Sequence, residues 1–260
     1  MKRRFATVDV FTDRVFGGNP LAIVLDAEGL SSATMQAIAK EFNYSETTFV
    51  LPPADPANTA NVRIFNPVME MPFAGHPNVG TGFWLARQGE AFGRPLGDRL
   101  VFEELAGLVP ITAIHHDGNV VGADVTAPKR LMRGETIPVD AIAACLGLDH
   151  GDIVTAFPPL ARGLHVYVWD PDAATTGLDI HCRMFAPLDG IAEDPATGSA
   201  NAALAALIAS TRPPGDLVLR IAQGDAMGRP SRLRATVDPA GTVTIGGTCV
   251  VIAEGHLSID

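Results

Sequence analysis

The chain lacks long apolar runs and an excess of positive charge, and each absence excludes a class of protein. No apolar run reaches the roughly 18–20 residues that a membrane-spanning helix needs. The formal net charge is −10, from 19 basic and 29 acidic residues. A chain of this charge offers no basic stripe to neutralise nucleic-acid phosphates and is a poor match to an anionic membrane. We therefore expect neither nucleic acid nor a membrane among the partners.

Cysteine is scarce, and its spacing matches no metal-binding or redox pattern. The three cysteines are Cys145, Cys182 and Cys249. None lies in a C-x-x-C or Cys/His arrangement. The basic start of the chain is followed at once by Asp9 and Asp13 rather than by the apolar core of a signal peptide. These features predict reduced thiols in a cytoplasmic protein.

Several catalytic and cofactor-binding motifs are also missing. We find no G-x-G-x-x-G after a strand, no G-x-x-x-x-G-K-[ST], no H-E-x-x-H and no G-x-S-x-G. His115, His116 and Asp117 are contiguous, and without further ligands at helix or strand spacing they indicate a solvated turn rather than a metal site. We expect no metal and no cofactor.

Two short segments, one in each half of the chain, share a pattern that organises the rest. Residues 75–81 read GHPNVGT and residues 193–199 read EDPATGS, so each contains a polar residue, Pro, two residues, Gly and a hydroxyl. Each precedes an apolar helix-forming run. Each also follows a matching segment, RIFNP at 63–67 and RMFAP at 183–187. The offsets agree, since 183 − 63 = 120 and 195 − 77 = 118.

We interpret this pattern as an internal duplication. It predicts two similar domains, residues 1–117 and 118–260, each presenting a helix N-terminus to a shared site. The sequence leaves open whether the last strand returns to the first domain.

Local patterns place the main elements. Strands are expected at 8–11, 21–25, 44–51, 60–65, 100–105, 108–111, 120–127, 153–157, 164–169, 182–185, 217–222, 233–237 and 243–252. A helix is expected from Ser31 or Ser32 to a left-handed stop at Asn43. A second begins with Pro77 at its first position and ends near Gly89, and a third covers 138–146. A fourth follows Ser199.

Glu46 is the one carboxylate in the strand expected over 44–51. Alternation places it on a face with Tyr44, Thr48 and Val50. An exposed edge strand would explain it without any function. If the sheet instead wraps a helix, Glu46 is partly desolvated and its pKa is raised, which makes it a candidate catalytic group.

The Gly17-Gly18-Asn19-Pro20 segment also has two interpretations, a plain hairpin turn or a ligand-facing loop. In the second interpretation, Asn19 is the candidate ligand contact.

Two helix N-termini facing one cleft make a site for an anion, because free backbone N–H groups and the positive dipole ends both favour a carboxylate. Thr81 and Ser199 are expected in the first turns, where a hydroxyl binds that carboxylate or simply caps the helix. Gly80 and Gly198 would let a ligand approach the backbone. Capping explains either loop taken singly, whereas the duplication favours a binding site.

Three titratable groups then come together in the hypothesis: Glu46, His76 and Asp194. Two carboxylates and a histidine can take a proton from a bound acid and return it elsewhere, without metal or nucleotide.

At these residues the sequence resembles the PhzF family of phenazine-biosynthesis-like proteins. The matching segments follow one another along nearly the whole chain: residues 9–11, 18–22, 43–47, 72–77, 193–200 and 223–231. The resemblance implies an α+β, diaminopimelate-epimerase-like fold, in which each of two similar domains wraps a curved mixed sheet around a central helix.

The resemblance also implies roles. Glu46 matches the family's catalytic glutamate, and His76, Asp194 and Ser199 match its substrate-contacting positions, with Gly75 and Gly198 beside them. The founding activity is the isomerisation of trans-2,3-dihydro-3-hydroxyanthranilate, with the glutamate as proton shuttle. Members of the family are often homodimers, so a homodimer is implied here.

Related racemases and epimerases carry a cysteine in each organising loop, and here neither loop has one. A single base therefore favours an isomerase that moves a proton on a small unsaturated carboxylic acid. Two alternatives stay open: a racemase or epimerase of a small amino or hydroxy acid, and a non-catalytic ligand-binding or interaction protein on the same scaffold.

Overall fold

A computed structural model describes residues 2–134, 138–146, 149, 151, 163–187 and 190–259. The strands are β1 (Lys2–Val10), β2 (Asn19–Val24), β3 (Glu46–Leu51), β4 (Ala60–Phe65), β5 (Glu70–Met71), β6 (Glu90–Ala91), β7 (Arg94–Pro95), β8 (Arg99–Glu104), β9 (Gly107–His116), β10 (Asn119–Thr126), β11 (Leu164–Trp169), β12 (Ile180–Ala186), β13 (Ile191–Asp194), β14 (Leu217–Gln223), β15 (Ser231–Val237) and β16 (Val243–Ser258). The helices are α1 (Ser32–Phe42), α2 (Gly75–Gln88), α3 (Val139–Leu146), α4 (Ala173–Thr176) and α5 (Gly198–Ser210), with a 3₁₀ turn, η3 (Asp225–Met227). The strand expected at 153–157 lies outside the described residues.

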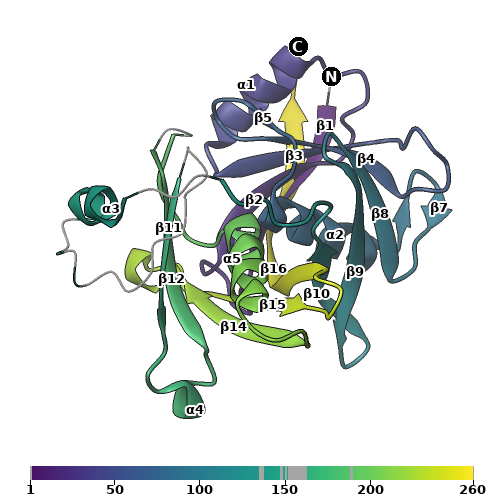
Figure 1. The fold of residues 1–260 in the computed structure, drawn as a ribbon. Helices are drawn as coiled ribbons and strands as arrows, with labels where there is room; N and C mark the ends of the chain where they lie inside the picture. The colour runs from purple at the N-terminus through teal and green to yellow at the C-terminus, as the bar shows by residue number, and fades with distance from the viewer. Residues whose placement is uncertain are drawn as a thin grey trace.

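The first part of the sheet closes into a ring around α2. The strand order is β1-β2-β3-β4-β8-β9-β10-β16, and β16 also pairs with β1, which completes the circle (Figure 1). Glycines let the helix fit this interior: a Cβ on Gly80 would lie 2.6 Å from Leu21, and one on Gly82 would lie 2.5 Å from Ile111. Gly80 therefore serves packing against the strands and does not face a ligand, contrary to the expectation from sequence.

The same sheet continues beyond the ring through β15, β14, β12 and β11, and α5 packs against β14, β15 and β16. The long strand β16 joins the two parts. Residues 243–248 of it pair with β10 or β15, and residues 249–258 pair with β1. The last strand thus returns to the beginning of the chain, and the two termini lie close together (Figure 1).

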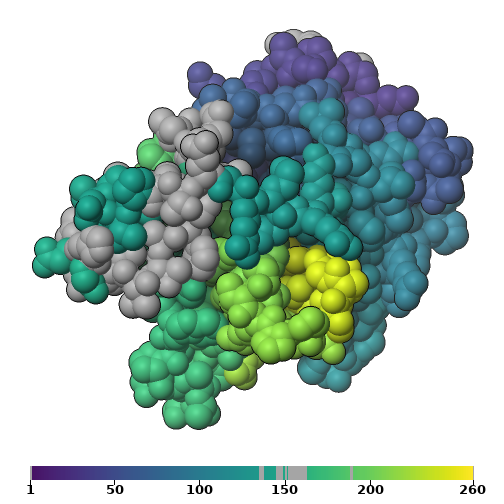
Figure 2. All heavy atoms as spheres, viewed as in Figure 1, coloured from purple at the N-terminus to yellow at the C-terminus, as the bar shows by residue number. Residues whose placement is uncertain are grey.

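Residues 117–118 form the turn between the antiparallel strands β9 and β10. The division into domains 1–117 and 118–260 stays a prediction. In the space-filling view, residues of the first half lie at the top and right of the molecule, and the green residues of the second half lie at the lower left (Figure 2).

Some local predictions are confirmed and others are wrong. The Ser31 side chain caps α1 by accepting from the Thr34 N–H, and Asn43 ends the helix in the left-handed conformation with φ 54°. Pro77 is not the first residue of α2, which begins two residues earlier at Gly75. The edge-strand explanation for Glu46 is also wrong, because β3 lies between β2 and β4.

Equivalent ion pairs mark the duplication in three dimensions. Arg63 on β4 makes a bidentate pair with Glu70 on β5, with both N–O distances 2.7 Å. Arg183 on β12 pairs in the same way with Glu193 on β13, at 2.7 and 2.8 Å. Each guanidinium also lies over the phenylalanine two residues further along its strand. No helix in the described ranges is long and apolar enough to cross a bilayer.

Candidate active site

The N-termini of α2 and α5 meet at two glycines. A Cβ on Gly75 would lie 2.7 Å from the Gly198 backbone, and one on Gly198 would lie 2.9 Å from the Gly75 backbone. Only glycine fits at either position without moving a helix. The two positive dipole ends, each equivalent to roughly half an elementary charge, therefore converge on one place.

These two helix starts differ from that of α1 in carrying no side-chain cap. The N-cap residues are Ala74 for α2 and Thr197 for α5, and in the described structure neither side chain bonds to the first turn. The first N–H groups of a helix have no acceptor within the helix. An N-cap side chain therefore does not account for either helix start, and the amides around Gly75 and Ser199 suit an anion.

Asp194, the last residue of β13, collects hydrogen bonds from three side chains. Its Oδ1 accepts from Asn19 Nδ2 at 2.8 Å and from Ser45 Oγ at 2.9 Å, and its Oδ2 accepts from Thr197 Oγ1. The side chain is buried, and burial raises the pKa of the Asp194 carboxyl, while the three hydrogen bonds limit the rise. Asp194 thus ties the first half of the chain to the start of α5.

Asn19 connects this group to His76. Its two amide hydrogens go to Asp194 and to the Ala196 carbonyl, at 2.8 and 2.9 Å. Its Nδ2 also lies 3.4 Å from His76 Nδ1, a longer contact than the other two.

Glu46 lies on the same side of the ring, with its Oε2 atom 3.3 Å from His76 Nδ1. The Glu46 side chain is 13% exposed and that of His76 only 3%. Burial lowers the pKa of His76 to about 3, although a hydrogen bond to the Pro20 backbone works against this. The ring is therefore neutral near pH 7, so its contact with Glu46 is not an ion pair.

A second layer of polar side chains supports the start of α5. Gln223 at the end of β14 donates to the Asp194 carbonyl at 2.8 Å and accepts from Asn201 at 2.8 Å and from the Thr197 N–H at 3.2 Å. Cys182 Sγ lies 3.3 Å from Asn201 Oδ1, and burial raises the pKa of this thiol to about 12. Cys182 is therefore a thiol, not a nucleophilic thiolate, at neutral pH.

Arg229 fixes the loop before Asn19. It donates to the carbonyls of Gly17 and Gly18 at 2.7 and 2.8 Å and to Asp9 Oδ1 at 2.5 Å. Gly18 has φ +61°, and a Cβ there would lie 2.2 Å from a backbone oxygen. Arg229 and Gly18 thus hold the segment 17–20 in place, and Asn19 within it is fully buried.

A cavity of about 350 Å³ opens beside Ser45. Its walls come from the loop before β3, the turn after β4, β13 and η3, as follows: Asn43, Tyr44, Ser45, Pro67, Gly190, Ile191, Ala192, Glu193 and Met227. This volume is at the lower end of the usual range for small-molecule sites. Within the described residues no group of three or more His, Cys, Asp or Glu side chains is arranged to hold a metal ion.

The structure brings Asn19, Glu46, Gly75, His76, Asp194, Gly198 and Ser199 together and separates Thr81 from them. Thr81 is the seventh residue of α2, not a first-turn residue, and its hydroxyl lies 2.9 Å from that of Thr48 inside the ring. The placement expected from sequence is wrong because the helix starts before Pro77.

Sequence reasoning singled out no role for Ser45, Thr197, Asn201 or Gln223. Asn201 and Asn78 are each the fourth residue of their helix, and both donate to their N-cap carbonyl at 3.0 Å. They lie 201 − 78 = 123 positions apart rather than the 118 of the repeated pattern, so the sequence alignment of the two halves did not pair them. Ser45 and Thr197 adjoin the residues that were named. Their hydroxyls became informative only once the Asp194 carboxylate was placed.

Comparison with known proteins points to one family of isomerases. A family model described as phenazine biosynthesis-like protein, PhzC-PhzF, matches residues 8–161 and 154–255. An uncharacterised isomerase of Mesorhizobium japonicum is 37% identical, with 99% of both chains covered. The trans-2,3-dihydro-3-hydroxyanthranilate isomerase of Pseudomonas aeruginosa is 34% identical, with 97% of this chain and 98% of that protein covered.

Among solved structures, a phenazine biosynthesis protein of Bacillus anthracis, of the PhzF family, matches with a TM-score of 0.80 at 23% identity over 100% of both chains. The likeness confirms the predicted α+β, diaminopimelate-epimerase-like fold.

Proposed function

Because the chain belongs to the phenazine biosynthesis-like PhzF family and is an isomerase, we propose that it moves a proton on a small unsaturated carboxylic acid, with Glu46 as general acid and base. The observation that carries this proposal is the Glu46–His76 contact of 3.3 Å at the meeting point of two uncapped helix N-termini. A base and an anion site then stand side by side.

The substrate carboxylate would bind the free N–H groups at the starts of α2 and α5, with the Ser199 hydroxyl beside them. Both dipole ends favour the negative charge. The substrate would thereby present its conjugated carbons to Glu46. Thr81 is not part of this proposal, because its hydroxyl faces Thr48.

Glu46 would remove a proton from the carbon next to the unsaturated system and return it further along the conjugated chain. One bond to hydrogen breaks and one forms, and the double bond shifts, so no oxidant or reductant is needed. His76, neutral because its pKa is lowered to about 3, would hold the Glu46 proton in line and polarise the substrate. Asp194 would hold Asn19 and Ser45 in place beside it.

Trans-2,3-dihydro-3-hydroxyanthranilate is the first candidate substrate, since a relative of 34% identity is named for that reaction. A homodimer in the cytoplasm stays a prediction.

The racemase alternative would require a second base on the opposite face of the substrate. Cys182, the cysteine nearest to the second loop in sequence, is buried and bonded to Asn201, and its thiol pKa of about 12 does not suit a base. This observation favours the single-base isomerase.

The proposal can be tested by following trans-2,3-dihydro-3-hydroxyanthranilate with the protein in deuterated buffer by proton NMR. Conversion to an isomer of equal mass, apart from deuterium gained at one carbon, would support it. Deuterium exchange at an α-carbon of an amino or hydroxy acid with loss of optical activity would favour the racemase. Binding without exchange or conversion across a panel of small unsaturated and amino acids would favour a binding protein.

A further inference from the structure

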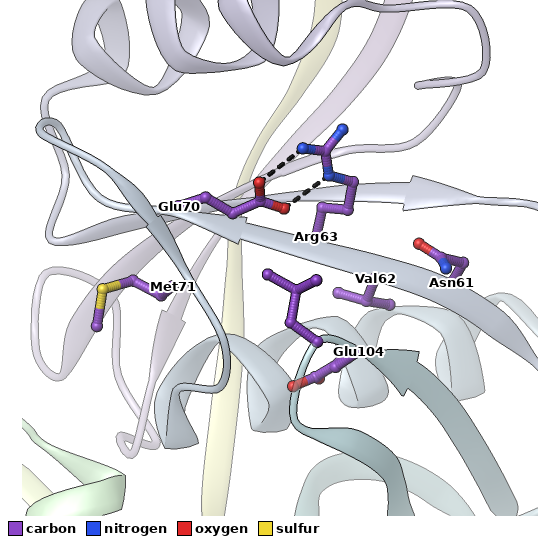
Figure 3. A pocket seen from close by; sticks show the side chains of 7 residues that line it. Asn61, Val62, Arg63, Glu70, Met71 and Glu104 are labelled. Atoms are coloured by element: carbon purple, nitrogen blue, oxygen red, sulfur yellow. Dashed lines mark hydrogen bonds and ion pairs between the residues drawn. The ribbon is translucent and has the colours of Figure 1, made fainter.

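Glu104 is a buried carboxylic acid that the proposed reaction does not use. It is the last residue of β8, and both of its side-chain oxygens are shielded from solvent and, among the described residues, without a partner in ordinary hydrogen-bond geometry. It lines a cavity of about 170 Å³ together with Arg63 and Glu70, which are paired with each other. Figure 3 shows the Glu104 carboxyl group pointing away from that ion pair.

The duplication assigns Glu104 a counterpart in the second half. In the parallel pair β4–β8, Ala60 lies opposite Phe102, and in the parallel pair β12–β14, Ile180 lies opposite Ile221. The offsets are 180 − 60 = 120 and 221 − 102 = 119. Two residues further along the strands, Glu104 therefore corresponds to Gln223.

Gln223 is fully bonded. Asn201 donates from one amide group both to Gln223 Oε1 and to the carbonyl of Thr197, the N-cap of α5. In the first half, Asn78 donates in the same way to the carbonyl of Ala74, the N-cap of α2, at 3.0 Å. The Asn78 Oδ1 atom is buried and, among the described residues, has no donor, whereas the Asn201 Oδ1 atom accepts from Cys182 Sγ. A group at position 104 that both accepts from the Asn78 amide and donates to Asn78 Oδ1 would complete this arrangement.

We propose that Glu104 works in its neutral, protonated form as the counterpart of Gln223, and that through Asn78 it positions the first turn of α2, which carries His76. A protonated carboxyl group has one O–H to donate, and Asn78 Oδ1 is an acceptor that lacks a donor. Ionised Glu104 has only acceptors. It would leave Asn78 Oδ1 without a donor and place a buried negative charge beside the first turn of α2, which would loosen the turn.

The surroundings of Glu104 support the neutral form. Burial raises the pKa of Glu104 to about 8, and the Asn78 side chain opposes this only in part. The Arg63 guanidinium on β4 is committed to Glu70 on β5. On β8 itself, Glu103 bonds to the N–H groups of residues 54 and 55. On α2, His76 is uncharged at neutral pH. Glu104 is therefore mostly neutral at pH 7 and becomes mostly ionised by pH 9.

This inference rests on the proposed function for its activity readout, so its test includes a measurement that needs no substrate. The side-chain carboxyl carbons of the protein, labelled with ¹³C-glutamate, are followed by NMR from pH 5 to 10 in wild type, Glu104→Gln and Glu254→Gln. We expect one glutamate with a midpoint near 8, absent only from Glu104→Gln, and a shift of the Gly75 and His76 amide signals with the same midpoint. A Glu104 signal that titrates below pH 6, or first-turn amides that do not follow it, would overturn the proposal.

The activity arm compares kcat against pH. Wild-type kcat should fall about tenfold between pH 7 and 9, since about nine-tenths of a group with pKa 8 is ionised one pH unit above it. Glu104→Gln should retain kcat within about threefold at pH 7 and lose this alkaline fall, whereas Glu104→Leu should lower kcat at every pH. The exposed Glu254→Gln should behave as wild type. An unchanged alkaline fall in Glu104→Gln refutes the role. If wild type converts no substrate, the proposed function fails alone, and the NMR arm still decides this one.

Discussion

The contact between Gly75 and Gly198 leads to the prediction that Gly75→Ala destabilises the protein and lowers its activity. The added Cβ would lie 2.7 Å from backbone atoms of Gly198 and Ser199. Ordinary contact begins at 3.4 Å, so the two helix ends must separate by 3.4 − 2.7 = 0.7 Å. No flexible side chain can yield there, because the atoms that the Cβ meets belong to the backbone.

The magnitude follows from two opposing effects. Forcing extra atoms into a packed contact costs about 1–3 kcal/mol, while replacing Gly by Ala inside a helix returns up to about 1 kcal/mol. We expect a net loss of roughly 1–2 kcal/mol in the free energy of unfolding. Because His76 and Asp194 stand on the two sides of this contact, kcat/KM should fall by about 10- to 100-fold, as for other displacements of this size.

Urea unfolding and steady-state kinetics would test both numbers. Gly97→Ala is the matched control, because a Cβ there meets nothing within 4 Å and φ is not positive. It should leave stability within about 0.5 kcal/mol of wild type or raise it slightly. If Gly75→Ala unfolds and turns over like Gly97→Ala, the two helix starts are not in the close contact that the site requires.

Two further predictions concern buried polar groups. In wild type, lowering the pH from 7.5 to 5 should reduce the free energy of unfolding by roughly 2 kcal/mol through His76, because its pKa is about 3 when folded and near 6.5 when unfolded, so the unfolded state gains a proton first. In urea unfolding, His76→Gln should lose about 2 kcal/mol less than wild type over the same pH range. Equal losses in the two proteins would contradict the buried neutral ring. Asn19→Asp replaces a donor to Asp194 and Ala196 by a second acceptor. It should lower the free energy of unfolding by about 2–5 kcal/mol and kcat by more than 100-fold at pH 7, whereas the exposed Asn119→Asp should change neither. A stable, active Asn19→Asp would rule out this hydrogen-bond network.

Local elements could be predicted from sequence because their signals are local. The cap at Ser31 and the stop at Asn43 bound α1 as expected, and β4 and β11 span the residues expected for them. The repeated loops indicated two helix starts but not their register, because α2 begins before its Pro, at Gly75, and α5 begins after its Pro, at Gly198.

Features that depend on distant residues could not be predicted in the same way. The pairing of β1 with β16 joins residues more than 200 positions apart and decides that the first sheet closes. Whether Glu46 stood on an edge depended on β2 and β4, which only the fold places beside it. Thr81 was misplaced because the preference of Pro for the first helical position did not hold once α2 was extended to meet Gly198.

The central claim is that Glu46 moves the proton, and Glu46→Gln tests it most directly. Proton NMR in deuterated buffer would follow trans-2,3-dihydro-3-hydroxyanthranilate with wild type, Glu46→Gln and the exposed Glu41→Gln. The amide keeps the shape of the side chain but cannot take up a proton, so conversion and deuterium uptake should fall by about 10²–10⁴-fold in Glu46→Gln alone, with an unchanged unfolding midpoint. Conversion by Glu46→Gln at the wild-type rate would contradict the account.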